Sequence, residues 1–298
     1  MSSIIFVGDL HLKGSSPISR VDDYPTVILN KLESLINIAK SFSCDKIMLL
    51  GDVFDSHITT LPYLAKVINT FRKISDAGID VYTIVGNHDI KNNRMDSLDS
   101  SALGILISTG YLKLAPRNLI IDDTSFNCFH YPEELTNNNN ESCYSVCVAH
   151  RYYEFGLSWD SLTSEDLKSL NYDAMILGHY HVPCDTLSIE DTVLYRPGSL
   201  SRSTSEPYNK LRTPRVLVFN CLNHKTVYVD IPCERADKIF TNVVEQNNQI
   251  CFSMKDLVKF ITSSYTSSDL NIRDYFAKLD IPYDCRVKIS DYLDNVGA

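Results

Sequence analysis

Short apolar stretches rich in β-branched residues recur along the first two-thirds of the chain and predict buried strands. Five of them each end directly before a polar motif, and they cover residues 3–7, 46–50, 81–85, 146–149 and 174–177. In open α/β sheets the loops that follow the carboxyl ends of the strands bind ligands. We therefore expect the five polar motifs to form a ligand site at the strand ends.

Apolar residues spaced three and four apart predict helices between these strands. The predicted helix at 25–42 has an apolar face made of Ile28, Leu32, Leu35, Ile36, Ala39 and Phe42. The helix at 61–77 has Pro62 in its first turn and a face made of Leu61, Leu64, Ile68 and Phe71. A capping-box pattern from Thr163 to Asp166 predicts a third helix that ends before Asp173. This alternation favours parallel strands joined by helical crossovers.

Later strand-like segments follow one another too closely for helices to fit between them, so we expect antiparallel pairing. They cover residues 185–189, 192–195, 215–220 and 225–231. The polar stretch 136–142 is typical of a mobile hairpin loop. Together these patterns predict an α/β fold in which a two-sheet mixed β-sandwich is flanked by helices.

The pattern changes after Pro232, where three helical segments are expected, at about 253–265, 268–278 and 285–295. We therefore divide the chain into a main domain, 1–232, and a helical C-terminal cap or partner-docking region, 233–298. At 298 residues and 44% apolar, the chain can bury one large core with a small appendage. It has no run of 18 apolar residues and no basic leader, so we expect a cytoplasmic protein without membrane contact. Nine cysteines without CxxC spacing indicate reduced packing residues.

The five polar motifs carry side chains that bind metal ions. In chain order they are Asp9-x-His11, Gly51-Asp52-x-x-Asp55, Gly86-Asn87-His88-Asp89, His150, and Gly178-His179-x-His181. Any one of these motifs alone would more often be a loop or a surface histidine. However, five of the eight histidines fall inside this ordered set, which chance explains poorly.

The five motifs together supply seven oxygen and nitrogen donors, from the side chains of Asp9, His11, Asp52, Asn87, His150, His179 and His181. Mixed imidazole and carboxylate ligands suit manganese, iron or zinc better than calcium or magnesium. Seven donors exceed the needs of one tetrahedral ion. They match two ions roughly 3.5–4 Å apart that share a carboxylate, the arrangement that holds both the attacking and the leaving oxygen of a displacement at phosphorus.

The motif order resembles that of the calcineurin-like metallophosphoesterase superfamily, from about residue 3 to about residue 200. The boxes that begin at Gly8 (Gly-Asp-Leu-His-Leu), at Gly51 (Gly-Asp-Val-Phe-Asp) and at Arg196 (Arg-Pro-Gly-Ser-Leu-Ser-Arg) look most like those of bacterial and phage SbcD-type recombination nucleases. Protein Ser/Thr phosphatases of the same superfamily carry Asp-Arg-Gly and Gly-Asn-His-Glu instead. The resemblance implies the four-layer fold of that superfamily.

The resemblance also implies roles for individual residues. Asp9, His11, Asp52 and His181 would hold one divalent ion, and Asn87, His150 and His179 the other, with Asp52 bridging the two. Mn²⁺ is the expected metal, with Mg²⁺, Fe²⁺ and Zn²⁺ as alternatives. His88 would face the scissile phosphate as an acid or electrostatic group, and the carboxylate of Asp55 would orient it.

The net charge of −9 is unusual for a protein that binds nucleic acid, whose affinity comes largely from Lys and Arg. Two dications reverse the local sign, however. Basic residues also follow the motifs: Lys13, Arg20, Lys91, Arg94, Arg151, Arg202, Lys210, Arg212 and Arg215. We expect a positive rim around an acidic body, and we select Arg94, Arg151 and Arg202 as candidate substrate contacts.

Two functions from different classes of substrate remain open. The first is a manganese-dependent DNA exo/endonuclease that acts in recombination or repair with an SbcC-type SMC-like ATPase, with a homodimer also compatible. The second is a stand-alone phosphodiesterase or phosphatase on a small nucleotide. The complete ligand set disfavours a third reading, an inactive binding module. DNA needs a long open groove, whereas a nucleotide needs a closed pocket with stacking aromatic rings.

Overall fold

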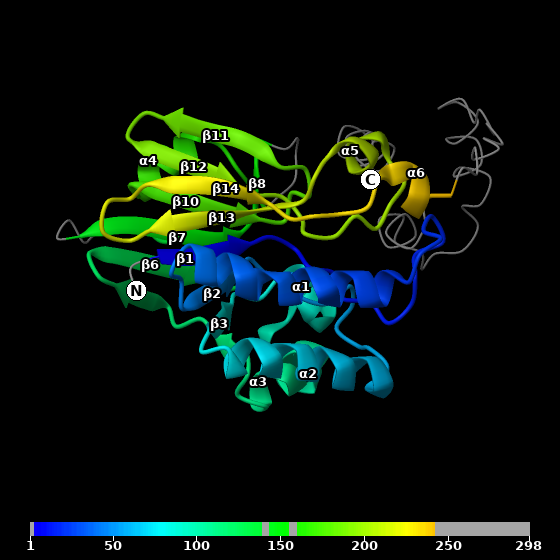
Figure 1. Ribbon diagram of the computed structural model, residues 1–298. Coiled ribbons are helices and arrows are strands. Elements are labelled where there is room, and N and C mark those ends of the chain that lie inside the picture. Colours follow the sequence, from blue (N-terminus) through cyan, green and yellow to red (C-terminus); the bar gives the residue numbers. More distant parts are fainter. Residues whose placement is uncertain (1–2, 139–142, 155–159, 242–298) are drawn as a thin grey trace, which may run out of the picture. The chain divides into compact units, whose positions relative to one another are not determined.

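The computed structural model describes residues 3–138, 143–154 and 160–241, which form one compact unit (Figure 1). Its first sheet has the strand order β14-β13-β1-β2-β3-β4. These strands are β1 (Ser3–Val7), β2 (Lys46–Leu49), β3 (Asp80–Thr83), β4 (Lys113–Leu114), β13 (Arg215–Asn220) and β14 (Thr226–Asp230). The strands from β1 to β4 pair in parallel, whereas β13 is antiparallel to both β1 and β14.

The second sheet has the order β11-β12-β10-β7-β6-β5. Its strands are β5 (Asn118–Ile121), β6 (Thr124–Phe129), β7 (Tyr144–His150), β10 (Ala174–Gly178), β11 (Cys184–Ile189) and β12 (Thr192–Arg196). The antiparallel pairing predicted for 185–195 and 215–231 is confirmed. Residues 139–142 of the hairpin predicted at 136–142 lie outside the described residues. The strands on either side, β6 and β7, pair in parallel, whereas a hairpin would join antiparallel strands. Two short strands, β8 (Tyr152–Tyr153) and β9 (Ser161–Leu162), pair separately.

The longer helices begin where the sequence provides caps. Helix α1 (Tyr24–Ser41) is capped by Asp23, and α2 (Leu61–Asp76) has a proline in its first turn. Helix α4 (Ser164–Leu170) begins with the predicted capping box. The other helices are short: α3 (Ala102–Ser108), α5 (Pro207–Leu211), α6 (Ala236–Ile239), and the 3₁₀ turns η1 (Asn87–Asp89), η2 (Lys91–Asn93) and η3 (Met95–Ser100).

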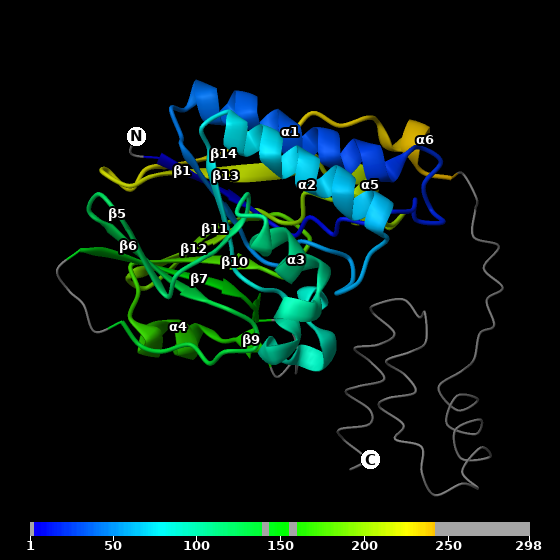
Figure 2. The ribbon, with the colours of Figure 1, turned by 90° about the horizontal axis from the view of Figure 1, so that it is seen from below.

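Three apolar layers hold the elements together. In β1 the alternation places Ile5 and Val7 against α1, α2 and α3, while Ile4 and Phe6 pack against the second sheet. The other face of the second sheet packs on α4 through Leu167. The order is therefore helices, sheet, sheet, helix, and Figure 2 shows α1, α2 and α3 along one side of the strands. The predicted α/β fold with two mixed sheets flanked by helices is confirmed.

Two residues predicted on buried helix faces are exposed. Leu61 is 76% exposed and Phe42 is 38% exposed. Leu61 is the first residue of α2 and Phe42 follows the last residue of α1, so neither lies over the sheet. The division at residue 232 stays a prediction, and the three helices expected after residue 252 lie outside the described residues. Within the described part, no helix is both long and apolar enough to cross a membrane.

Candidate two-metal site

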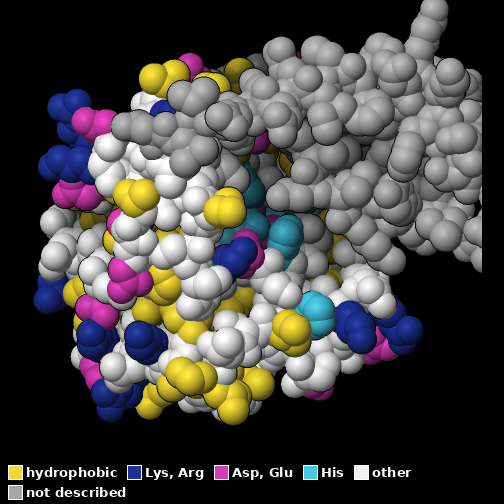
Figure 3. Space-filling model, turned by 90° about the vertical axis from the view of Figure 1, so that its right-hand side faces the viewer, with side chains coloured by type: hydrophobic (Ala, Val, Ile, Leu, Met, Phe, Trp, Pro, Cys, Tyr) yellow, Lys and Arg dark blue, Asp and Glu magenta, His cyan; other side chains and the backbone are white. Residues whose placement is uncertain are grey.

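The five motif loops meet at the carboxyl ends of strands from both sheets. Strands β1, β2 and β3 of the first sheet and β7 and β10 of the second each run directly into one of them. Figure 3 shows histidine side chains gathered in a hollow on this end of the molecule. The site therefore needs both sheets, and each contributes part of the candidate ligand set.

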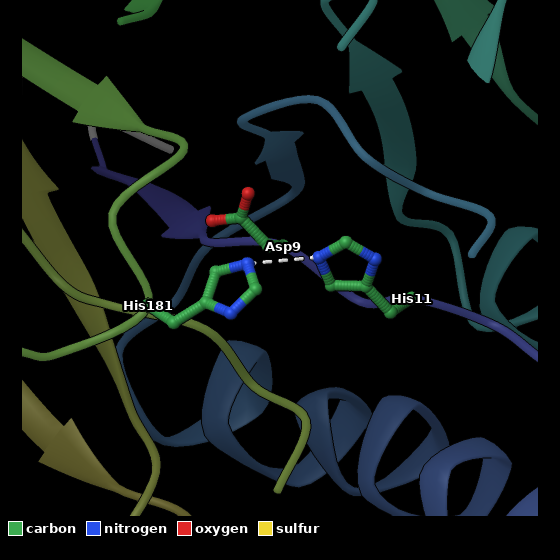
Figure 4. A group of neighbouring side chains, drawn as sticks. All are labelled: Asp9, His11 and His181. Carbon is green, nitrogen blue, oxygen red and sulfur yellow. Dashed lines mark hydrogen bonds between the residues drawn. The ribbon is translucent and has the colours of Figure 1, made fainter. Parts of the chain in front are cut away.

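Asp9, His11 and His181 form the first candidate ligand group. His11 Nε2 and His181 Nε2 lie 2.9 Å apart, and both rings converge beside Asp9 (Figure 4). Burial lowers the pKa of His11 well below its usual range and that of His181 to about 4. Two neutral imidazoles that face each other this closely suit a shared cation, because a metal binds imidazole through a deprotonated nitrogen.

Asp52, His150 and His179 form the second candidate group. His150 Nε2 lies 3.3 Å from Asp52 Oδ2 and 3.1 Å from Asn87 Oδ1. Its other nitrogen, Nδ1, lies 2.7 Å from the Leu50 carbonyl oxygen, which can only accept. Nδ1 thus carries a proton, and Nε2 points toward the carboxylate and the amide oxygen. Although burial opposes the charged ring, Asp52 raises the pKa of His150 to about 9.

Asp52 lies at the centre of the site, since it belongs to the second group and also lies with His11 and His88 in a third. Its Oδ2 is 3.8 Å from His11 Nε2, and its Oδ1 accepts from the His88 amide at 2.9 Å. Although burial alone would raise it, the neighbouring His150 holds the pKa of Asp52 well below its usual range. Gly86 makes this packing feasible, because a Cβ there would lie 2.2 Å from Asp52 Oδ1.

His88 lies on the solvent side of this group, with its side chain 44% exposed and Nε2 4.0 Å from Asp52 Oδ2. Burial opposes the charged ring, but Asp52 and the Asp55 backbone raise the pKa of His88 overall. The predicted carboxylate partner needs correction: His88 Nδ1 bonds the backbone carbonyl of Asp55 at 2.8 Å. The Asp55 carboxylate instead pairs with Lys13 Nζ at 2.9 Å and lies 3.8 Å from His11 Nδ1.

Two buried carboxylates were missed by sequence reasoning. Asp89 accepts from the amides of Phe54, at 3.0 Å, and Gly86, at 2.9 Å, and so joins the second motif loop to the third. Asp160 Oδ2 lies 3.1 Å from His179 Nε2. Asp89 was visible as the last residue of its motif, but Asp160 lies in a stretch with no recognisable pattern and could not have been selected.

The candidate substrate-binding arginines divide into one exposed and two buried side chains. Arg94 is exposed and pairs with Asp96 at 2.5 Å. Arg151 is only 6% exposed and donates to the carbonyl oxygens of Glu133 and His150. Arg202 is 2% exposed and donates to the carbonyls of Asn209 and Glu234. Arg151 and Arg202 therefore do not belong to the expected positive rim. Both are buried and donate hydrogen bonds to backbone carbonyl oxygens.

Comparison with known proteins gives relatives at low identity. The chain is 24% identical over 216 residues to the DNA double-strand break repair protein Mre11 of Haloferax volcanii, covering 69% of this chain and 47% of the relative. It is 26% identical over 183 residues to the uncharacterized metallophosphoesterase YkoQ of Bacillus subtilis, covering 60% of each. A dimetal phosphatase structure from Danio rerio aligns at 13% identity and TM-score 0.46, covering 77% of this chain and 99% of that one.

The chain spans less than half the length of the Mre11 relative from Haloferax volcanii, so likeness to that protein covers one part of it. The family model described as calcineurin-like phosphoesterase matches residues 2–183, more than half of this chain. That range contains all seven candidate ligands at the strand ends described above. The chain therefore belongs to the calcineurin-like phosphoesterase family, a class of metal-dependent phosphoester hydrolases.

Proposed function

We propose that the chain is a two-metal phosphodiesterase that cleaves DNA in recombination or repair. One observation carries the proposal: two candidate ligand groups adjoin at Asp52, and a separate, half-exposed histidine lies on their open side. A site with two cations and a nearby imidazole is suited to in-line displacement at phosphorus.

The residues present fit a pair of dications. Asp9 and Asp52 are fully or almost fully buried, and within the described part of the chain neither forms an ion pair with a lysine or arginine. Buried carboxylates need a compensating charge. Asp9, His11, Asp52 and His181 would hold one ion, and Asn87, His150 and His179 the other, with Asp52 between them. When bound, the ions would polarise the phosphoester and supply a nucleophilic hydroxide.

His88 would act separately from the ligands. Its raised pKa favours an imidazolium whose Nε2 proton is available on the exposed side of Asp52, while Nδ1 is fixed by the Asp55 carbonyl. A proton held there can stabilise charge on the phosphate or pass to the leaving oxygen, a contribution of roughly 10²–10⁴ in rate.

The substrate and partners follow from similarity rather than from the geometry. The Mre11 relatives are named as DNA double-strand break repair proteins, and the motif boxes resemble SbcD-type nucleases. DNA is therefore the proposed substrate, Mn²⁺ the proposed metal, and an SbcC-type ATPase the proposed partner. A small nucleotide is the second candidate, because the two adjoining ligand groups and His88 would serve a small phosphodiester as well as they would serve DNA.

The test compares cleavage of linear duplex and single-stranded DNA with hydrolysis of bis(p-nitrophenyl) phosphate and nucleotides, all with Mn²⁺. Wild-type protein should bind two ions and hydrolyse the small diester, and Asp52→Asn should lose both the activity and bound metal. Absence of hydrolysis in a protein loaded with two ions would overturn the phosphodiesterase proposal.

The substrate class is decided by charge removal at exposed positions near η1. Lys91→Ala combined with Arg94→Ala should weaken cleavage of long DNA and flatten its salt dependence, because fewer counterions are released on binding. Hydrolysis of the small diester should not change. Lys66→Ala combined with Arg72→Ala, exposed on α2, serves as the charge-matched control. Efficient nucleotide hydrolysis without DNA cleavage would favour the second candidate.

A further inference from the structure

Asp160 is a buried carboxylate that contacts a candidate ligand without belonging to a ligand group. Its residue is 7% exposed, and it directly precedes β9, which pairs with β8 beside the site. Its Oδ2 lies 3.1 Å from Nε2 of His179, the residue that directly follows β10. None of the metal-ligand groups found among the described residues includes Asp160. It therefore contacts the imidazole from outside the proposed metal pair.

The contact has a chemical consequence for His179. An ionised carboxylate can only accept a hydrogen bond, so the proton of the neutral ring lies on Nε2. Nδ1 then keeps the free electron pair, and a metal can bind only through that nitrogen. We propose that Asp160 is a positioning residue that fixes the tautomer and orientation of His179, so that Nδ1 is presented to the second ion. This rests on the proposed two-metal function.

Other contacts restrain the same histidine at different points. Its backbone amide donates to both carboxylate oxygens of Asp9, at 3.1 and 3.2 Å. Its φ of 84° places the backbone in the left-handed region, so the residue is held by its surroundings. The Tyr152 ring packs on the imidazole of His179, with 3.9 Å between the ring centroids. Backbone and ring face are thus fixed by Asp9 and Tyr152, and the proton position is left to Asp160.

The first experiment measures Mn²⁺ binding by calorimetry and by electron paramagnetic resonance. Asp160→Ala should lower the affinity for one of the two ions by roughly 10–100-fold, the usual effect of removing the hydrogen-bond partner of a metal ligand. The affinity for the other ion should stay nearly unchanged. Asp160→Asn should restore most of the affinity, because its amide oxygen still accepts from Nε2. Glu165→Gln, an exposed carboxylate nearby on α4, is the control and should bind as wild type.

A second experiment needs no variant to fold. Long-range ¹H–¹⁵N correlation spectra of the zinc-loaded wild-type protein should show His179 protonated at Nε2 and metal-bound at Nδ1. Protonation at Nδ1, or two unchanged affinities in a folded Asp160→Ala, would overturn the inference. Failure of the wild-type protein to bind two ions would instead refute the proposed function on which it rests, so the two failures are distinguishable.

Discussion

At the scale of single residues, the proton on His88 is held by a carbonyl oxygen and not by a carboxylate. The Asp55 carbonyl accepts at 2.8 Å, and the Asp55 side chain is paired with Lys13 at 2.9 Å. A backbone acceptor survives any side-chain substitution at that position. The orientation of His88 should therefore be independent of the carboxylate that sequence reasoning assigned to it.

This difference predicts unequal effects of two substitutions. Asp55→Asn should lower kcat by less than about tenfold, whereas His88→Ala should lower it by roughly 10²–10⁴ while keeping two bound ions. Steady-state kinetics on bis(p-nitrophenyl) phosphate and metal analysis of each purified protein measure both effects. Equal losses of kcat in the two variants would show that the Asp55 carboxylate, and not only its backbone carbonyl, orients His88.

The sequence predicted residues well where function and local pattern coincide. Asp9 and His11 directly follow a strand, so their place at the sheet edge could be read from the chain. Asp160 could not be found, because it is 19 residues from His179 and only the tertiary fold brings them together. The burial of Arg202 was missed for a similar reason: its backbone partners, Asn209 and Glu234, lie on later segments.

At the scale of elements, periodicity predicted α1 and α2 to within one or two residues, but it could not show how the helix ends meet the sheet. It also missed Lys31, a charged residue that α1 buries. Lys31 is 7% exposed and donates to the Leu200 carbonyl at 3.1 Å. Burial, opposed by Cys233 and helped by Arg20, Arg202 and Arg212, lowers the pKa of Lys31 from 10.5 to about 7.

Lys31 should make stability depend on alkaline pH. Between about pH 7 and pH 10.5 the unfolded chain binds a proton at this position that the folded chain has released, so the free energy of unfolding should rise with pH. Below pH 7 both states are protonated. Burial of the charged ammonium then lowers the free energy of unfolding by the full amount, on the order of a few kcal/mol. Urea unfolding of wild type and Lys31→Met across pH 6–10 tests this. Parallel pH profiles for the two proteins would contradict it.

At the scale of the whole molecule, one apolar layer joins the two halves of the site. Phe126 of β6 packs against Phe6 of β1 at 5.5 Å and Phe219 of β13 at 5.8 Å between ring centroids. Asp9 and Asp52 follow strands of the first sheet, and His150 ends β7 of the second. The distance between candidate ligands therefore depends on how the sheets pack together.

Loosening that layer should weaken metal binding as well as the fold. Phe126→Ala should lower the free energy of unfolding by roughly 3–5 kcal/mol. It should also reduce the affinity for Mn²⁺, because the ligands come from both sheets and the ions would bind only when the sheets are packed together. Leu167→Ala, behind the second sheet, should destabilise the protein but leave Mn²⁺ affinity near that of wild type. Thermal unfolding over a range of Mn²⁺ concentrations separates the two effects. Equal metal affinities in both variants would disprove the link.

The pairing of β1 with β13 has a consequence for synthesis on the ribosome. Strand β1 ends at Val7, yet the neighbour that covers one of its edges begins at Arg215. At about 5–20 residues per second, the nascent chain waits on the order of ten seconds or more before that edge can be paired. An open edge is a template for pairing with other chains. The candidate ligands, too, are all present only once His181 has emerged, so a partly made chain should be unable to cut the nucleic acid around it.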